Sequence, residues 1–361
     1  MDAVIVGAGI IGCAIARELT TRGVACTLLD DRPVGGGATQ ASAGMLAPYV
    51  EAHDPGPLLD LGVRSLGLYD DWIDAVRRES GIDVEYRRIG TLEIALDPQH
   101  AAELRSAAAG DVNPPLTWIE PAAARTKQPS LGALEGALFT PCHGYVAAHQ
   151  LAHALARAAE AGGARFRTAR AGRITRTSAG FTIQTTTGHV SATRVVVAAG
   201  SWSSAIEIDD AAAVPVRPVR GQLLHLGWHE APLDTIIWGP ECYVVPRLDG
   251  TVLVGATVEE VGFDERATSA GVRDLLDAFC DLLPGGWGAA FLEARVGLRP
   301  AAPDDLPIIG RDPDVDGLVH ATAHYRNGVL LAPITALMVA DLMTANKEDA
   351  ALEALAPGRF R

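Results

Sequence analysis

The chain has 361 residues, of which 48% are hydrophobic and 20% are charged, and its formal net charge is −14 at pH 7. This composition excludes an intrinsically disordered protein and indicates a folded chain long enough for two domains. The acidic balance and the lack of a basic cluster argue against nucleic acid as a partner.

The cysteines indicate the cellular compartment. Five of them are scattered without C-x-x-C spacing: Cys13, Cys26, Cys142, Cys242 and Cys280. This pattern predicts a reduced protein with neither a structural disulfide nor a zinc or other metal site. The first motif starts at residue 2, which leaves no room for a signal peptide, and no apolar run reaches the length of a membrane span. We therefore expect a cytoplasmic protein without a membrane partner.

The N-terminal segment, residues 2–30, predicts a strand, a helix and a second strand. Gly7, Gly9 and Gly12 follow the first strand in G-x-G-x-x-G spacing, and Asp30 ends the second. These glycines suit a tight turn, close approach of a pyrophosphate and close helix–strand packing, and the acid suits a ribose. The segment predicts a dinucleotide site and disfavours NADP, because Asp30 stands where a 2′-phosphate needs a basic residue. The alternative is a glycine-rich turn in a nucleotide-free α/β domain.

Small residues fill the next stretch, GGGATQASAGMLAP at 35–48. This composition suits a backbone lying against a large planar ligand, although a flexible surface loop has the same composition. Residues 151–164 predict an amphipathic helix that ends at glycines. A hairpin then leads into the apolar strand RVVVAAG at 194–200, which is placed to bring a second backbone segment to the dinucleotide.

An arginine near the C-terminus needs a partner. Arg299 lies between Leu298 and Pro300, and a guanidinium is rarely buried unpaired. The partner is either a nearby acid, Asp304 or Asp305, or a group that the chain itself does not carry. The last motif, residues 323–343, predicts a strand end, an Asn327-Gly328 turn and an apolar helix whose residues Val329 to Leu342 belong to the core.

Several motifs occur together in one order: the N-terminal glycines, ASAGMLAP (41–48), VVVAAGSW (195–202), VRGQ (219–222), YVVPR (243–247), GLRP (297–300) and HYRNGVLLAP (324–333). This set resembles the FAD-dependent D-amino acid oxidase superfamily, and most closely the glycine oxidases of thiamin thiazole biosynthesis. The resemblance runs from residue 3 to residue 345.

The resemblance implies an α/β fold of the two-domain α+β kind. A glutathione-reductase-type Rossmann domain for FAD is expected from residues 1–85, 145–215 and 300–361. A substrate domain with an antiparallel sheet is inserted as residues 86–144 and 216–299.

The resemblance also implies a set of cofactor residues. Ile10 and Ile11 lie by the pyrophosphate, and Asp30 and Asp31 by the adenosine ribose. The other positions expected along the cofactor or around the flavin are Ala38, Thr39, Ala43, Gly44, Met45, Ala171, Gly200, His324, Tyr325, Arg326, Asn327, Gly328, Val329 and Leu330. A helix N-terminus aimed at the flavin would stabilise the charge that develops there on reduction.

For the substrate, the resemblance assigns Arg299 as the carboxylate anchor, with Tyr243 and Arg326 nearby. A buried strand tyrosine with a packing role is the rival interpretation of Tyr243, and Arg220 is interpreted as structural. The side-chain pocket is expected from residues 216–296. Related sarcosine oxidases attach FAD through a cysteine near the position of Gly297, so FAD is expected to be non-covalent here.

The implied activity is oxidation of glycine or a small amino acid by hydride transfer to FAD, with dioxygen as the second partner and hydrogen peroxide as a product. No side chain is assigned as a catalytic base. A D-amino acid dehydrogenase that uses a quinone or another acceptor is the first alternative. A non-catalytic flavoprotein subunit is the second, and an intact Arg299 and Tyr243 argue against it. A homo-oligomer is expected from the family alone.

Overall fold

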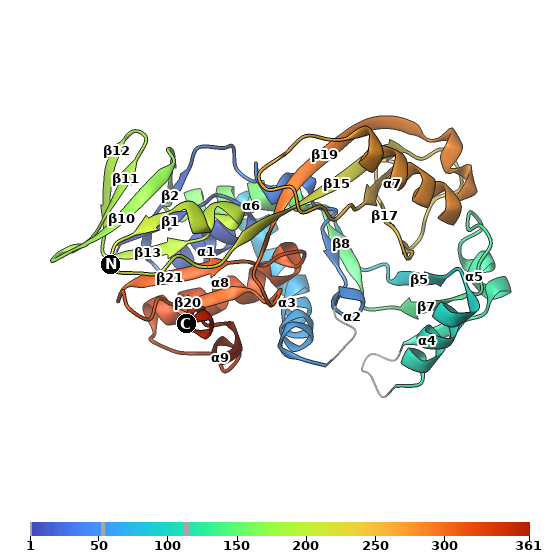
Figure 1. The fold of residues 1–361 in the computed structure, drawn as a ribbon, viewed down its shortest axis with the longest axis horizontal. Helices are drawn as coiled ribbons and strands as arrows, with labels where there is room; N and C mark the ends of the chain where they lie inside the picture. The colour runs from blue at the N-terminus through green and yellow to red at the C-terminus, as the bar shows by residue number, and fades with distance from the viewer. Residues whose placement is uncertain (1, 52–54, 111–115) are drawn as a thin grey trace.

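The computed structural model describes residues 2–51, 55–110 and 116–361. Two large sheets lie beside each other along its longest axis (Figure 1). The long strands β15 (Arg217–Gly227) and β19 (Ala290–Ala301) pair with each other and run from the centre of the molecule into the second sheet. They therefore bring residues of the second sheet next to the first.

The first sheet has six strands in the order β20-β21-β13-β1-β2-β9, and only β20 and β21 pair antiparallel. Its strands are β1 (Asp2–Val6), β2 (Ala25–Asp30), β9 (Arg165–Thr168), β13 (Arg194–Val197), β20 (Ile308–Arg311) and β21 (Leu318–Thr322). Successive side chains of a strand point to opposite faces. Ala3 and Ile5 join the core under the helices, whereas Val4 and Val6 join a core on the other face. The continuous apolar run of β1 is thus what a sheet covered on both faces requires.

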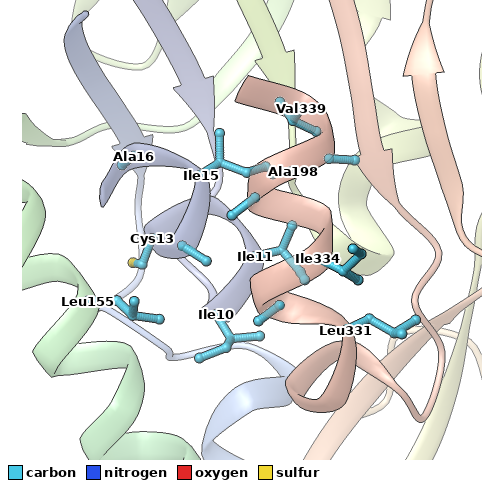
Figure 2. Close-up of a cluster of buried hydrophobic side chains, with 14 of the residues drawn as sticks. Ile10, Ile11, Cys13, Ile15, Ala16, Leu155, Ala198, Leu331, Ile334 and Val339 are labelled. Atoms are coloured by element: carbon cyan, nitrogen blue, oxygen red, sulfur yellow. The ribbon is translucent and has the colours of Figure 1, made fainter. Parts of the chain in front are cut away.

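Helices α1 (Ile10–Thr21) and α8 (Gly328–Thr344) pack on one face of this sheet, and α3 (Pro57–Ser80) and α6 (Ala148–Ala161) pack against these helices. Figure 2 shows Ile11 and Ile15 of α1 beside α8, with Leu155 of α6 on the far side of α1; Ile334 and Val339 of α8 belong to the same core. Nearly every residue of α8 is buried, which suits a helix that is apolar on all sides. The core role predicted for its residues is confirmed.

A four-stranded sheet covers the other face, in the order β12-β11-β10-β14. Its strands are β10 (Ala171–Thr177), β11 (Gly180–Thr185), β12 (Gly188–Ala192) and β14 (Glu207–Ile208). The inward side chains Ile174, Phe181 and Ile183 pack against Val4 and Val6 of β1.

The second large sheet has eight strands in the order β19-β15-β18-β17-β16-β5-β7-β6, mostly antiparallel, with β16 and β5 parallel. Its other strands are β5 (Thr91–Ala95), β6 (Thr117–Ile119), β7 (Gly136–Thr140), β16 (Ile236–Trp238), β17 (Tyr243–Pro246) and β18 (Thr251–Gly255). Helices α4 (Pro98–Ala108), α5 (Pro121–Lys127) and α7 (Ser269–Leu282) pack against it.

Short elements complete the fold. A three-stranded sheet joins β3 (Met45–Leu46), β8 (Gly144–Val146) and β4 (Tyr86–Arg87). Single turns form α2 (Pro48–Glu51), α9 (Leu352–Leu355) and the 3-10 helices η1 (Ala38–Ala41), η2 (Gly200–Ala205), η3 (Pro284–Gly288) and η4 (Pro357–Phe360). Among the described helices, none has the length and apolar character needed to cross a bilayer.

The mixed α/β fold predicted from the sequence is confirmed. The strands of the six-stranded sheet come from residues 2–30, 165–197 and 308–322. The domain boundaries themselves remain a prediction, because membership of a sheet does not divide a chain into domains.

Candidate active site

A cavity of about 1020 Å³ lies where the two large sheets meet. The predicted substrate residues Arg299, Tyr243 and Arg326 all line it. So do nearly all the predicted cofactor residues: Gly7, Gly9, Ile10, Ile11, Asp30, Asp31, Ala38, Thr39, Ala43, Gly44, Met45, Ala171, Gly200, His324, Tyr325, Asn327, Gly328 and Val329. Gly12 and Leu330 do not line it. Segments far apart in the sequence therefore converge on one site.

The glycines of the first turn leave no space for side chains. Gly7 has φ +111°, and a Cβ there would lie 2.3 Å from the carbonyl oxygen of Ala198. A Cβ on Gly12 would lie 2.0 Å from the carbonyl oxygen of Gly7. Gly12 thus serves the close packing of α1 on β1, away from the cavity. Because these positions hold backbone close to backbone, the turn is built as the G-x-G-x-x-G spacing predicts.

The N-terminus of α1 and the end of β2 form one end of the cavity. The Ile10 N–H donates to Thr39 Oγ1 at 3.2 Å. The Asp30 carboxylate accepts from the N–H groups of Ala8 (2.8 Å) and Arg32 (2.9 Å), which fixes it at the cavity wall. A helix N-terminus favours phosphate, and a fixed carboxylate suits ribose hydroxyls. The residues present therefore fit a dinucleotide.

Four side chains form a clasp beside this end: Arg32, Trp202, Phe263 and Glu265. The Arg32 guanidinium donates to both carboxylate oxygens of Glu265, at 2.7 and 2.8 Å, and lies 4.1 Å from the Trp202 ring centre. The Phe263 ring centre is 5.8 Å from that of Trp202. Arg32 and Trp202 line the cavity, whereas Phe263 and Glu265 belong to the loop between β18 and α7. The clasp thus ties this loop to the wall of the cavity.

Arg299 lies at the other end of the cavity, on β19. Its Nη1 donates to the carbonyl oxygen of Thr257 at 2.8 Å. The nearby acids are engaged elsewhere, Asp304 with Arg359 at 2.8 Å and Asp305 with Arg217 at 4.0 Å. The interpretation that Arg299 forms a structural salt bridge with Asp304 or Asp305 is therefore wrong. Within the described ranges, no carboxylate lies within 4.0 Å of its guanidinium, which leaves it without an ion-pair partner.

Two strand glycines make room for the side chains at this end. A Cβ on Gly221 of β15 would lie 2.4 Å from Cζ of Arg299, so the guanidinium lies directly over that glycine. A Cβ on Gly255 of β18 would lie 2.5 Å from the Tyr243 hydroxyl. Both glycines line the cavity. The sequence interpretation missed them, although a glycine inside a strand is a signal for close approach.

Tyr243 has features of both roles considered for it, which are binding the substrate carboxylate and packing in the sheet. Its ring stacks on Trp238 with centres 5.6 Å apart, and both residues line the cavity. Burial raises the pKa of its phenol to about 12, against the opposing effect of Arg299. The hydroxyl therefore stays protonated near neutral pH and is able to donate a hydrogen bond.

Glu51, at the end of α2, was not predicted as a site residue. Its carboxylate lies 3.0 Å from Nε of Arg326, its side chain is only 11% exposed, and it lines the cavity. Burial raises its pKa, while the charges of Arg326 and Arg299 oppose that change. Glu51 lies outside residues 216–296, from which the side-chain pocket is expected. The sequence around Glu51 has no pattern that signals this pairing.

The turn before α8 differs from the predicted one. Helix α8 begins at Gly328 itself, and the left-handed residues are Ala323 (φ 57°) and Tyr325 (φ 46°). The N–H of Tyr325 donates to the carbonyl oxygen of Pro300 at 2.8 Å, which ties the turn to the residue after Arg299. Left-handed non-glycine residues cost energy and cluster at functional sites. The predicted Asn327-Gly328 turn is therefore wrong by two residues.

His324 and Leu330 are among the predicted residues of this region that are buried. His324 Nε2 lies 3.0 Å from Thr335 Oγ1, and burial lowers the pKa of the imidazole to about 3. His324 is therefore neutral at physiological pH. Leu330 lies in the core instead of the cavity, and its carbonyl oxygen accepts from Ser65 Oγ at 2.6 Å.

Three other residues considered in the sequence analysis are Arg220, Gly297 and Cys242. Arg220 is buried and pairs with Glu259 and, at 3.1 Å, with Asp264, which confirms its structural role. Gly297 lines the cavity, and a Cβ there would lie 3.0 Å from the Ala41 Cβ. Of the described cysteines, Cys242 lines the cavity, and burial raises the pKa of its thiol to about 12. A protonated thiol is a poor nucleophile.

Comparison with known proteins was made for the whole chain. A family model described as FAD dependent oxidoreductase (DAO) matches residues 2–342. A glycine oxidase of Geobacillus kaustophilus is 34% identical over 95% of this chain and 92% of its own length. A bifunctional ThiO/ThiG protein of Nostoc is 36% identical over 96% of this chain, which spans only 53% of that relative.

Solved structures agree with these sequence matches. The crystal structure of the Geobacillus kaustophilus glycine oxidase has a TM-score of 0.91, with 97% of this chain and 95% of that chain covered. The crystal structure of an iminodiacetate oxidase from Chelativorans sp. BNC1 has a TM-score of 0.89 at 26% identity, with 98% of each chain covered. Both similarities span the two large sheets and the cavity between them.

Proposed function

The chain belongs to the DAO family of FAD dependent oxidoreductases, and from this premise we propose that it oxidises glycine and other small amino acids, such as sarcosine and small D-amino acids, at the Cα–N bond. The observation that carries the proposal is the guanidinium of Arg299, which has no ion-pair partner among the described residues and lies in the same cavity as the glycine-rich turn. A free guanidinium fork is suited to a carboxylate, which every amino acid carries.

The cavity offers the groups that hold FAD. The backbone at Gly7 to Ile11 and the N-terminus of α1 suit its pyrophosphate, Asp30 suits its ribose, and the turn from His324 to Val329 would lie by the flavin. When bound, FAD would supply the acceptor for the hydride that leaves the substrate Cα, and dioxygen would take up the two electrons with two protons to give hydrogen peroxide. Gly297 and the protonated thiol of Cys242 support non-covalent binding.

The side chains of the substrate end hold and orient the amino acid. Arg299 keeps two nitrogens for a carboxylate beyond the one that donates to Thr257, and the protonated Tyr243 hydroxyl is able to donate to the same group. Fixing the carboxylate fixes Cα, which is the requirement for hydride loss. The N-terminus of α8 lines the same cavity, and its dipole favours negative charge there.

The amine itself must be neutral to lose a hydride, so activity is expected to rise with pH toward the pKa of the substrate amine. The product is an imino acid, which water hydrolyses to a keto acid and an amine. Glycine gives glyoxylate and ammonia, and sarcosine gives glyoxylate and methylamine. We assign no side chain as a base. Similarity to a ThiO/ThiG protein supports a role in thiamin thiazole synthesis as a proposal. A cytoplasmic homo-oligomer is proposed as a family expectation alone.

The decisive experiment measures oxygen uptake and peroxide on purified yellow protein, with glycine, sarcosine, D-alanine, D-proline and the L-enantiomers. Peroxide formed with glycine or sarcosine supports the proposal. Substrates that bleach the flavin anaerobically while consuming little oxygen would favour a dehydrogenase with another acceptor. If no amino acid bleaches the flavin, the substrate class is wrong.

A pair of variants tests the anchor. Arg299→Ala should raise KM for glycine steeply while the protein still purifies yellow. Arg299→Lys keeps the charge but lacks the fork, so its KM should lie between those of the wild type and the alanine variant. Loss of FAD from both variants would make Arg299 structural instead.

A further inference from the structure

Three charged side chains lie at the substrate end of the cavity: Arg299, Arg326 and Glu51. Arg326 is compensated, because its Nε lies 3.0 Å from the Glu51 carboxylate. The contacts of Arg299 are with carbonyl oxygens, of Thr257 at 2.8 Å and of Arg220 at 3.4 Å. Of the two arginines at this end of the cavity, Arg326 forms an ion pair within 4.0 Å, whereas Arg299 forms none with the described residues.

The electrostatic interaction between Arg326 and Glu51 is stronger than that of an exposed surface ion pair. The Glu51 side chain is 11% exposed, so water and salt screen its charge poorly. The Arg326 side chain is 37% exposed and lies 5.8 Å from the ring centre of Trp238, at the cavity wall. A ligand with a second anionic group would have to displace Glu51 from Arg326 or leave a buried carboxylate beside its own charge. Either event is costly.

We propose that Glu51 is a specificity-determining residue: by neutralising Arg326, it restricts the site to amino acids that carry a single carboxylate. The inference rests on the proposed function and adds to it the class of substrate that the site rejects. Glycine and sarcosine present one carboxylate, which Arg299 holds. A substrate such as iminodiacetate, which is glycine with a second carboxylate on its nitrogen substituent, would meet Glu51 where it needs a cation.

The test compares glycine with iminodiacetate in wild-type holoenzyme and in Glu51→Gln. The amide keeps the size of the side chain but removes its charge, which frees the guanidinium of Arg326. The ratio of kcat/KM for iminodiacetate to that for glycine is expected to rise about ten- to hundredfold, the range of one charge-assisted hydrogen bond. The same shift should appear in KM more than in kcat, because the gain is in binding.

Two further variants make the result specific. Glu241 also lines the cavity but is exposed, so Glu241→Gln removes one negative charge without freeing Arg326. This matched control should change the ratio less than about twofold, since exposed charges are screened. Combining Glu51→Gln with Arg326→Gln should abolish the gain for iminodiacetate, because the gain depends on that guanidinium.

Binding of inhibitors gives a readout without turnover. Malonate and acetate are titrated against the flavin absorbance of the holoenzyme, and Glu51→Gln should strengthen malonate binding relative to acetate. If the glutamine variant does not retain FAD, Glu51→Ala is used; it also removes the charge and should show a shift in the same direction.

The outcomes separate this inference from the function on which it rests. An unchanged ratio in Glu51→Gln, or an equal loss for both substrates, overturns the specificity role while glycine oxidation by the wild type stands. If the wild type oxidises no amino acid and its flavin responds to neither inhibitor, the proposed function itself fails. A ratio that rises equally in the Glu241 control would refute the assignment to Glu51.

Discussion

Gly221→Ala tests the geometry of the anchor without touching its charge. The added Cβ would lie 2.4 Å from Cζ and 2.5 Å from Nη1 of Arg299. Carbon contacts settle at about 3.5 Å, so the guanidinium has to move by about 1 Å. Gly221 lies within strand β15, where alanine is tolerated, and the displaced atoms are the end of a flexible side chain. The variant should therefore fold and keep its flavin.

The expected effect is on catalysis. A misplacement of about 1 Å in a positioning group costs about 10²-fold in rate, so kcat/KM for glycine should fall by that factor. The free energy of unfolding should change by less than about 1 kcal/mol, because no buried contact is lost. Oxygen uptake gives kcat/KM, the ratio of flavin to protein absorbance gives FAD content, and thermal denaturation gives stability.

Gly227→Ala is the matched control on the same strand. Its Cβ would lie 3.3 Å from the Ala290 Cβ, and Gly227 is not among the residues that line the cavity, so activity should stay within about twofold of wild type. Wild-type kcat/KM in Gly221→Ala would refute the placement of the substrate carboxylate on Arg299. A loss of activity that follows the loss of flavin or of fold would equally fail to support it.

Three further predictions concern the cofactor and stability. Asp30→Ala should raise the Kd for FAD about tenfold or more, by the loss of charge-assisted bonds to the ribose; titration of apoprotein measures it, and an unchanged Kd would remove Asp30 from that role. Glu265→Ala and Arg32→Ala should each speed FAD release about two- to fivefold, which is the contribution of a partly exposed ion pair, and the double variant should be little faster than either. Fluorescence of released flavin reports the rate. If Arg32→Ala speeds release and Glu265→Ala does not, Arg32 contacts FAD directly. Glu93 is buried without a charged partner in the described structure, and burial raises its pKa from 4.5 to about 7. Between these two pH values the native state keeps a proton that the unfolded state has lost. The free energy of unfolding therefore falls as pH rises from 4.5 to 7. Glu93→Gln should remove that fall and stabilise the protein at pH 8 by on the order of 3 kcal/mol relative to wild type, measured by denaturant unfolding at pH 5 and pH 8; equal pH dependence in the two proteins would contradict it.

The sequence alone identified the parts that depend on local physics. Strand, glycine turn and helix follow one another in residues 2–21, and the requirement for Gly7 and Gly12 comes from backbone contacts within and beside that segment. The apolar helix α8 was predicted because its composition demands burial on all sides. Arg299 stood out because a guanidinium between Leu298 and Pro300 needs a partner, and the structure removes the two nearby acids as candidates.

The tertiary structure decided which residues meet. Gly221 lies under Arg299 because β15 and β19 pair in one register, and Glu51 reaches Arg326 because α2 and the turn before α8 line the same cavity. The turn lies at Tyr325 and Arg326, two residues before the predicted position, and the Tyr325 N–H is held by the carbonyl oxygen of Pro300. Contacts between distant segments depend on strand register and packing, and no local pattern encodes those. The sequence therefore predicts the kind of ligand groups expected at the site, and the fold determines which of its charged side chains form ion pairs with each other.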